Sequence, residues 1–344
     1  MNNENDILRY IKTHILSSSK DVYEGLNDRI SYATIKRRIA TLLEKQYLLQ
    51  DGNAKNSRYS VSPLYNLFYP VNLDEYYQQE IDQRKIQSEY NFSLIPDLLS
   101  KVSFFTENEL GLLNSLQNKF TYNLSQLTPA EYQNEIERMG IDLSWESSQI
   151  EGNTYSLLET ERLLKEKEAA PGKKKEETVM LLNQKDALDF IVKDPDCFEL
   201  LTVKGIEHIH SILIKDLGLD CTIRTRRVGI TGTNYRPIDN ESQIREALEQ
   251  ACHLVNSRRN VFEKALLTLV LLSYIHAFSD GNDRVARIVS NAIFIANKYC
   301  PVSFRTVDSV DYKKAMLLFY EQNNISAFKE VFINQFKFAV ETYF

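Results

Sequence analysis

Cysteine is scarce in this sequence, and the few cysteines follow no pattern. Four of the 344 residues are cysteine, and they lie far apart at Cys197, Cys221, Cys252 and Cys300. Such scattered thiols fit neither a disulfide-stabilised secreted fold nor the paired spacing of a zinc site. We therefore expect reduced cysteines with structural roles.

Long apolar runs and targeting signals are also missing. No apolar stretch reaches the roughly 20 residues of a membrane-spanning helix, and the first residues, M-N-N-E-N-D, lack the basic and apolar regions of a signal peptide. These absences predict a cytoplasmic protein with no membrane partner. A hydrophobic content of 43% over 344 residues is typical of a globular protein with more than one domain.

The charge is acidic overall but basic near the N-terminus. The net charge of −6 argues against a general nucleic-acid binder. Residues 1–62, however, hold ten Lys and Arg against seven Asp and Glu, a net charge of +3, which leaves −9 for the remainder.

Residues 1–62 have the pattern of three helices followed by a hairpin. Apolar residues recur at helical spacing in 6–16, a short helix begins after Ser18, and Ser31 caps a third helix. The polar turn at 51–53 separates two short strand-like segments. This order resembles a winged helix-turn-helix, whose third helix and hairpin carry the basic residues Lys36, Arg37, Arg38, Lys55 and Arg58. Two interpretations stay open: DNA contact through that helix and wing, and protein contact or dimerisation with ordinary solvated side chains.

The next segment changes character. Residues 63–100 are irregular, aromatic and punctuated by prolines. Free linkers are poor in aromatic residues, so this composition predicts an arm that packs on a neighbouring domain. Helical patterns dominate from Thr106 to the C-terminus. We divide the chain into residues 1–62, a connecting arm with helices at 63–139, and a C-terminal domain at 140–344.

The most informative segment is His276–Arg287, which reads H-A-F-S-D-G-N-D-R-V-A-R between two helix-like runs. A Gly-Asn turn that opens a helix presents free backbone N–H groups, which favour an anion. Arg284 and Arg287 are three residues apart and share one helix face. These features predict a polyphosphate site.

Two further side chains of this segment suit phosphate chemistry. Asp280 could hold Mg²⁺ against a polyphosphate, because Mg²⁺ prefers carboxylate and phosphate oxygens. His276 has the natural pKa for deprotonating a hydroxyl near pH 7. The alternative is a helix-turn-helix corner with solvated arginines.

The segment resembles the signature of Fic-domain proteins, H-x-F-x-[D/E]-G-N-G-R-x-x-R. The matching residues are His276, Phe278, Asp280, Gly281, Asn282, Arg284 and Arg287. The resemblance implies a mainly α fold, with a Fic-type helical core and a β-hairpin flap beside the N-terminal winged helix-turn-helix. Position 283 departs from the family, because Asp283 replaces the usual glycine and adds negative charge near the expected phosphates.

A second segment, Ser147–Gly152, resembles the inhibitory motif [S/T]-x-x-x-E-[G/N] of the same family. The resemblance implies that this helix lies beside the nucleotide site and that Glu151 pairs with Arg287. A carboxylate on this guanidinium would occupy the fork that should hold the γ-phosphate. The alternative is a surface glutamate near a helix end.

A third segment, 228–237, mixes β-branched residues with glycines, which predicts a hairpin. It resembles the family's flap, whose edge pairs with an extended segment of the target protein. The expected docking residues are Val228, Gly229, Ile230, Thr231 and Gly232. The alternative is an inert surface hairpin.

Together these resemblances imply an autoinhibited protein adenylyltransferase that moves AMP from ATP to a Ser, Thr or Tyr hydroxyl of a target protein. His276 would act as the base, Asp280 would hold Mg²⁺, and the donor would be bound by Gly281, Asn282, Arg284 and Arg287. Two other functions stay open: a DNA-binding regulator whose Fic-like domain senses nucleotide, and a transferase of another phosphate-containing group. A homodimer is compatible with the sequence, which leaves the oligomeric state open.

Overall fold

The structure is a computed structural model that describes residues 3–26 and 30–344, without the side chains of Asn3 and Lys55. The chain divides into two compact units, and each is described by itself. Unit 1 comprises Met1–Val71 with Gln322–Ser326, and unit 2 comprises Asn72–Glu321 with Ala327–Phe344.

Unit 1 contains the predicted three helices and hairpin. Its elements are α1 (Asn3–Thr13), α2 (Ser19–Gly25), α3 (Tyr32–Glu44), β1 (Leu48–Asp51), η1 (Ala54–Asn56), β2 (Arg58–Val61) and α4 (Pro63–Phe68). Ser18 closes a capping box on α2, and the Ser31 hydroxyl accepts from the Thr34 N–H at the start of α3. The strands pair antiparallel, with Leu48 opposite Val61. The order of elements agrees with the sequence pattern, and the winged helix-turn-helix stays a prediction.

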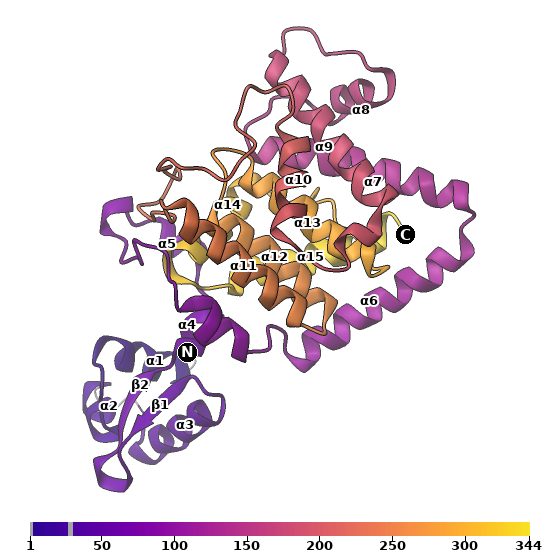
Figure 1. The fold of residues 1–344 in the computed structure, drawn as a ribbon. Helices are drawn as coiled ribbons and strands as arrows, with labels where there is room; N and C mark the ends of the chain where they lie inside the picture. Colours follow the sequence, from indigo (N-terminus) through magenta and orange to yellow (C-terminus); the bar gives the residue numbers. More distant parts are fainter. Residues whose placement is uncertain (1–2, 27–29) are drawn as a thin grey trace. The chain divides into compact units, whose positions relative to one another are not determined.

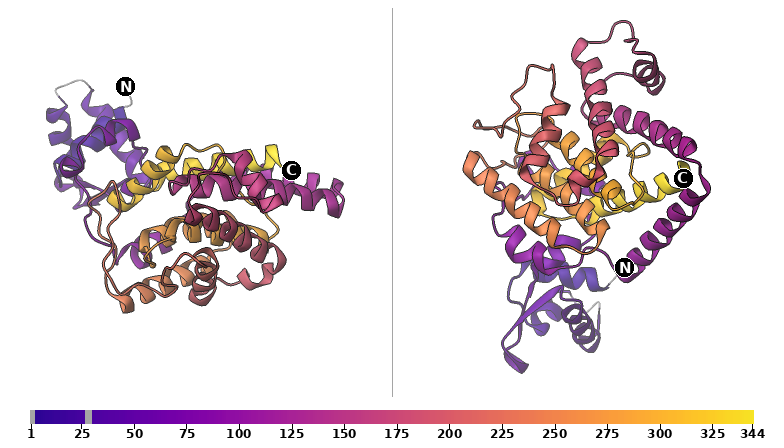
Figure 2. Two further views of the ribbon diagram at one scale, coloured as in Figure 1. Left: turned by 90° about the horizontal axis from the view of Figure 1, so that it is seen from above. Right: turned by 45° about the vertical axis from the view of Figure 1, so that its right-hand side comes forward.

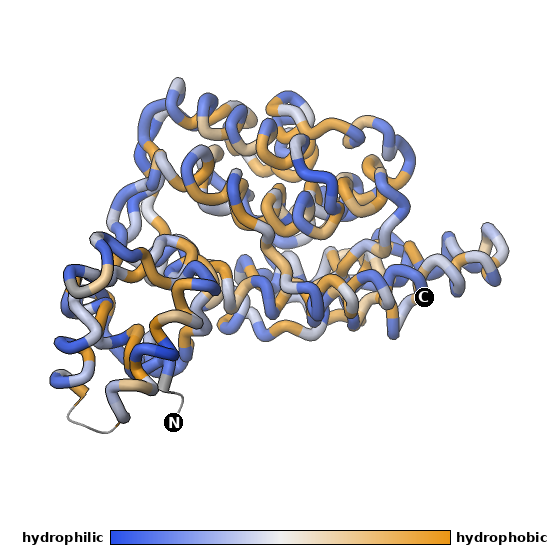
Figure 3. The backbone as a smooth tube through the Cα atoms, turned by 90° about the horizontal axis from the view of Figure 1, so that it is seen from below, coloured by the Kyte–Doolittle hydropathy of each residue, from blue (hydrophilic) through white to orange (hydrophobic). Residues whose placement is uncertain are grey.

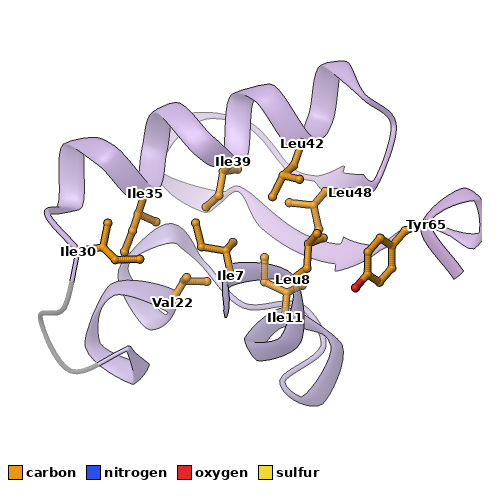
Figure 4. Close-up of a cluster of buried hydrophobic side chains, with 10 residues drawn as sticks. All are labelled: Ile7, Leu8, Ile11, Val22, Ile30, Ile35, Ile39, Leu42, Leu48 and Tyr65. Atoms are coloured by element: carbon orange, nitrogen blue, oxygen red, sulfur yellow. The ribbon is translucent and has the colours of Figure 1, made fainter. Parts of the chain in front are cut away.

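One apolar cluster holds unit 1 together. α1, α2 and α3 contribute most of its side chains, and Leu48 and Tyr65 complete it (Figure 4). Because Tyr65 lies on α4, the compact unit continues past the predicted boundary at residue 62. Burial of these faces explains why a helix as short as α2 is stable here, since short helices depend on tertiary packing.

Unit 2 is mainly helical. It starts with an arm, residues 72–105, that contains α5 (Leu73–Tyr77), η2 (Ile81–Gln83), η3 (Leu94–Leu98) and η4 (Leu99–Lys101). The helices that follow are α6 (Glu107–Gln126), α7 (Pro129–Ile150), α8 (Leu157–Glu166), α9 (Lys175–Lys193), η5 (Pro195–Phe198), α10 (Val203–Leu213), α11 (Glu241–Ser257), α12 (Val261–Ile275), α13 (Asn282–Ala296), α14 (Ser309–Gln322) and α15 (Ser326–Thr342). The chain crosses into unit 1 for Gln322–Ser326, at the end of α14 and the start of α15.

Two central helices form the core of unit 2. Every residue of α12 except Lys264 is buried, and most of α13 is buried too. A helix that is apolar on all faces belongs in the interior, and Figure 1 shows α12 and α13 surrounded by other helices of this unit. Among the described residues, no helix is both long and apolar enough to cross a membrane.

Helices α6 and α7 meet in a V and bring the inhibitory motif to the core. Two views show this corner (Figure 1 and Figure 2), where Thr128 caps α7 through a capping box with Glu131. The outer ends of α6 and α7 are largely hydrophilic (Figure 3). The second half of α7 is buried, so its last turn lies within the core and not on the surface.

The flap, residues 228–237, differs from the predicted β-hairpin. Within the described residues only β1 and β2 form a sheet. The flap has a turn at 231–232, and the two segments on either side of this turn do not pair. Main-chain groups that could pair in a flap hairpin have other partners. The Gly232 carbonyl accepts from Arg84, and the Arg236 N–H donates to the Ser88 carbonyl. Pro237 has no N–H to offer. The predicted hairpin is therefore wrong, and the flap is a braced turn.

Candidate active site

The loop between α12 and α13 brings the motif residues together. α12 ends at His276, which has a left-handed backbone (φ 54°), and Gly281 (φ 80°) precedes the first residue of α13. A Cβ at Gly281 would approach the Arg284 Nη2 atom to 3.3 Å, so both conformation and space favour glycine there. Gly281 provides no side-chain cap, which leaves the first N–H groups of α13 for another acceptor.

Asn282 holds this loop closed. Its side-chain oxygen accepts from the Phe278 N–H and its amide donates to the Phe278 carbonyl, both at 2.8 Å. Asn282 is 4% exposed, and these bonds use one of its two amide N–H groups. The Asn282 side chain thus clamps the loop, and its backbone N–H and second amide N–H are left for a phosphate.

His276 presents a neutral imidazole. Burial lowers the pKa of this histidine, and the negative charge of Asp283 opposes the effect. Its Nδ1 atom is buried and has no hydrogen bond of normal geometry within the described residues. The His276 carbonyl accepts from Arg224 Nε at 2.8 Å, and the Arg224 N–H donates to the Ala277 carbonyl. Arg224, which sequence reasoning did not identify, thus holds the main chain of the histidine.

Both motif arginines are buried. Arg284 is 1% exposed, donates to an Asp280 carboxylate oxygen at 3.0 Å, and reaches the Leu213 carbonyl. Arg287 is fully buried and lies over the Tyr312 ring at 5.3 Å. Its Nη1 atom and the Arg284 Nε atom have no partner among the described residues. Buried guanidinium groups with unused donors are suited to an anionic ligand.

The inhibitory motif contacts Arg287 as the resemblance implied. Arg287 Nη2 donates to a Glu151 carboxylate oxygen at 2.9 Å and to the Ser147 carbonyl at 3.0 Å. Arg287 Nε donates to the Ser147 hydroxyl at 2.9 Å. Glu151 is the residue that follows α7, and its side chain stays partly exposed. Separation of this pair would leave a buried cation without its carboxylate.

Negative charge is unusually dense around this site. Asp283 is half-buried in the first turn of α13, where the helix dipole favours it, and the Tyr320 hydroxyl lies 3.5 Å from its carboxylate. Two arginines, Arg284 and Arg287, stand against three carboxylates: Glu151, Asp280 and Asp283. With His276 neutral, these five side chains carry one net negative charge.

His210 supports the loop and was not identified from the sequence. It is buried on α10, its ring stacks on Phe278 with centroids 3.7 Å apart, and burial lowers its pKa. Its nitrogens face the Asp280 carbonyl at 3.1 Å and the Cys221 carbonyl at 3.3 Å. A neutral ring has one N–H, so it satisfies one of these carbonyls at a time.

Glu146 is a buried acid on α7, four residues before Ile150. It is 5% exposed, and burial raises its pKa to about 7, although the nearby charge of Arg287 opposes the shift. A buried carboxylate on the helix that carries the inhibitory motif gives this helix a pH-sensitive group.

A cavity of about 560 Å³ opens between the flap and the arm. Val228 and Gly229 of the predicted docking segment line it, whereas Ile230, Thr231 and Gly232 do not. Tyr90 and Phe92 of the arm form another part of its wall, and Phe92 is half exposed. The cavity is therefore partly aromatic and lies against a main-chain edge.

Asp280 is the residue that fits a magnesium ion. The described residues contain no group of three or more His, Cys, Asp or Glu in a metal-binding arrangement. Mg²⁺ needs no such group, since it binds through one or two carboxylates, water and substrate phosphates. The Asp280 side chain is about half exposed and uses one oxygen on Arg284.

Comparison with known proteins agrees with this geometry. Residues 200–294 match the Fic/DOC family. The chain is 30% identical over 172 residues to the protein adenylyltransferase Fic of Nematostella vectensis, which covers 49% of this chain and 40% of that protein. It is 25% identical over 173 residues to the protein adenylyltransferase fic-1 of Caenorhabditis elegans, at 47% and 33% coverage. The matches thus span less than half the length of these curated relatives.

Solved structures share the fold. Fic-1 (residues 134–508) from Caenorhabditis elegans matches with a TM-score of 0.59 and 18% identity, over 69% of this chain and 72% of that one. A Fic domain containing signaling protein from Bacteroides thetaiotaomicron matches with a TM-score of 0.57 and 19% identity, over 67% and 96%. The predicted mainly α fold with a Fic-type core is confirmed.

Proposed function

The chain contains a Fic domain, and from this premise we propose that it is a protein adenylyltransferase. It transfers AMP from ATP to a Ser, Thr or Tyr hydroxyl of a target protein. The observation that carries the proposal is the α12–α13 loop, where a neutral buried His276 stands beside an uncapped helix N-terminus and two buried arginines. A proton acceptor next to an anion site is what nucleotidyl transfer to a hydroxyl requires.

The mechanism follows from these positions. His276 takes the proton of the target hydroxyl, whose oxygen forms a bond to the α-phosphorus of ATP. The bond between this phosphorus and the bridging oxygen breaks, and pyrophosphate leaves. The first N–H groups of α13, including that of Asn282, together with Arg284 and Arg287 stabilise the charge on the phosphates.

Asp280 would hold Mg²⁺ on the donor phosphates. When bound, the ion neutralises charge that develops on the transferred and leaving groups. Arg284 pairs with one oxygen of the Asp280 carboxylate, so the other oxygen would be the one to hold the ion. Gly281 keeps the backbone close enough for the phosphates to approach.

The flap positions the target. We assign Val228, Gly229, Ile230, Thr231 and Gly232 to docking of an extended target segment, with the 560 Å³ cavity receiving one of its side chains. Exposed main chain in this segment offers hydrogen bonds without much sequence demand.

Glu151 acts as an inhibitor of the same reaction. Its ion pair with Arg287 occupies the guanidinium that the terminal phosphate of ATP needs. ATP that binds without this arginine holds its α-phosphorus out of line with the attacking oxygen, and the transfer is slow.

Labelling with α-phosphate-labelled ATP and Mg²⁺ tests the proposal. We expect weak self-labelling of the unchanged protein, at least about tenfold more in Glu151→Gly, because one charge-assisted hydrogen bond contributes about 1.5–3 kcal/mol, and none after His276→Ala. Glu135→Gly is a matched control, since Glu135 is an ion-paired acid on α7, the helix that Glu151 follows, but pairs with Arg138, away from the site. Equal labelling in all four proteins would refute both the base and the inhibitor.

DNA binding is a second candidate function, favoured by the surface of α3. Tyr32, Ala33, Lys36, Arg37 and Ala40 are all exposed. Small residues beside basic ones suit a helix that enters a groove. Arg38, in contrast, pairs with Glu4 at 3.1 Å and is partly used.

A gel-shift titration at two salt concentrations tests this function. Specific binding that Lys36→Ala and Arg37→Ala together abolish would support it, and binding that these changes leave intact would contradict it. ATP-independent DNA binding without any label transfer would favour the regulator over the enzyme.

A further inference from the structure

The flap is held at its tip by one buried arginine of the arm. Arg84 Nη2 donates to the Gly232 carbonyl at 2.7 Å, in the turn of the flap. Its Nη1 atom lies 3.3 Å from a Glu321 carboxylate oxygen, and both side chains are almost fully buried. The guanidinium also lies over the Tyr77 ring at 5.0 Å. One planar group thus serves the flap, α14 and the arm together.

Further bonds tie the returning half of the flap to the arm. Asn234 donates to an Asp82 carboxylate oxygen at 2.8 Å, and the Arg236 N–H donates to the Ser88 carbonyl at 2.8 Å. Between them, the Tyr235 hydroxyl donates to the Tyr274 carbonyl, two residues before His276. Within the part of the chain that the structure describes, no main-chain hydrogen bond holds the first half, residues 228–230, so it stays available as a main-chain edge.

The carboxylate partner of Arg84 is also fixed from several sides. The Tyr76 hydroxyl donates to Glu321 at 2.6 Å, and the Gln87 N–H donates to the Glu321 carbonyl at 2.8 Å. Glu321 is the last residue of unit 2 before the chain crosses into unit 1. Its position is therefore set by the arm and not by loose surface contacts.

We propose that Arg84 is a positioning residue for target docking. It holds the flap where the hydroxyl of a docked target can reach His276. This inference rests on the proposed function. An arginine is required because its rigid fork reaches the Gly232 carbonyl and the Glu321 carboxylate at once, and a lysine ammonium cannot span both. Arg84 touches neither donor nor acceptor and acts through the flap.

Hydrogen exchange of the full chain tests the contact directly. Arg84→Lys keeps a cation beside Glu321 but loses the fork, so we expect amide exchange across the flap to become about tenfold faster, the change for one lost charge-assisted bond. Trypsin cleavage after the exposed residues Arg226 and Arg227 should accelerate in parallel. Exchange in α12 and α13 should not change.

Arg258→Lys is the matched control. Arg258 is a half-buried arginine of unit 2 that pairs with a glutamate, Glu263, at 3.5 Å and donates to a carbonyl, that of Val102, at 2.9 Å. It has no contact with the flap, so flap exchange should stay at the unchanged rate. Equal acceleration in both lysine variants, or none in Arg84→Lys, would overturn the proposal.

Kinetics in the Glu151→Gly background separate positioning from general destabilisation. Arg84→Lys should lower the maximal rate of self-labelling about tenfold and leave the ATP concentration for half-maximal rate unchanged. A parallel rise in that concentration would show damage to the donor site and refute the assignment. If Arg84→Lys fails to fold, Asn234→Ala removes the neighbouring exposed hydrogen bond to Asp82 and should accelerate exchange of the same flap amides. Unchanged exchange in Asn234→Ala would count against the role of the arm in holding the flap.

The two proposals fail separately. Absence of label transfer by Glu151→Gly would remove the proposed function, whereas exchange and proteolysis would still decide whether Arg84 holds the flap.

Discussion

Neutralising Asp283 should tighten binding of Mg²⁺–ATP. This carboxylate lies in the first turn of α13, where the donor phosphates are expected, and its charge also acts on Arg284, Arg287 and His276. Asp283→Asn keeps the size of the side chain and a residue type that is accepted at a helix start. The change therefore removes one negative charge and little else.

The size of the effect follows from Coulomb's law. Two like charges about 5 Å apart repel by about 3 kcal/mol at an effective dielectric constant of about 20. Asp283 is half-buried, so solvent and salt screen part of this repulsion. A net gain of about 1 kcal/mol remains, which corresponds to a roughly fivefold lower Kd. Titration calorimetry in the Glu151→Gly background measures it without competition from the inhibitory carboxylate.

The pH dependence gives an independent second readout. Burial lowers the pKa of His276, and Asp283 partly offsets this lowering. Without Asp283 the pKa of His276 falls further, so the acidic limb of the rate profile should move to lower pH. Asp311→Asn, in the first turn of α14, removes an exposed helix-start carboxylate as a control. Unchanged or weaker ATP binding in Asp283→Asn, or an acidic limb that moves to higher pH, would refute this reasoning.

Two further predictions concern stability. Glu146 has a folded-state pKa of about 7, above its value of 4.5 when unfolded, so stability is lost as pH rises from about 4.5 through 7. Glu146→Gln should therefore stabilise the protein by roughly 3 kcal/mol at pH 8 and hardly at pH 4.5, as measured by urea unfolding; an equal gain at both pH values would contradict it. Asn282→Ala leaves two main-chain groups of Phe278 buried without partners and should cost about 2–4 kcal/mol in the same assay, against less than 1 kcal/mol if the loop is held otherwise.

Local signals in the sequence located the loop of the candidate site. The apolar run before His276 and the Gly281-Asn282 turn predicted one helix ending and another beginning, and α12 and α13 do so. The contact between Glu151 and Arg287, implied by the family resemblance, is also present. These features depend on residues close in sequence or on a motif of fixed spacing.

Contacts between distant segments could not be predicted. His210 lies 66 residues before His276 and sits on an apolar helix face, where a buried histidine gives no signal of its partners. Arg84 reaches the flap across 148 residues, and one arginine in an irregular arm carries no periodic pattern. The flap itself has strand-like composition, yet its main-chain groups bond to the arm and no ladder forms. The composition of the flap indicates only its β propensity, and its hydrogen bonds to the arm decide that no hairpin forms.

The balance of charges gives the proposed inhibition by Glu151 a physical basis that goes beyond steric competition. With Glu151 in place, the two motif arginines face three carboxylates, and withdrawal of Glu151 leaves them against Asp280 and Asp283 alone. A magnesium-bound triphosphate is itself negative, so it enters a repulsive site in the first case and a neutral one in the second. Because Asp283 is a fixed part of α13, the surroundings of the donor phosphates are more negative by one charge than they would be with glycine at position 283. Withdrawal of Glu151 and the change Asp283→Asn each remove one negative charge, so we expect each to tighten ATP binding and the two effects to add.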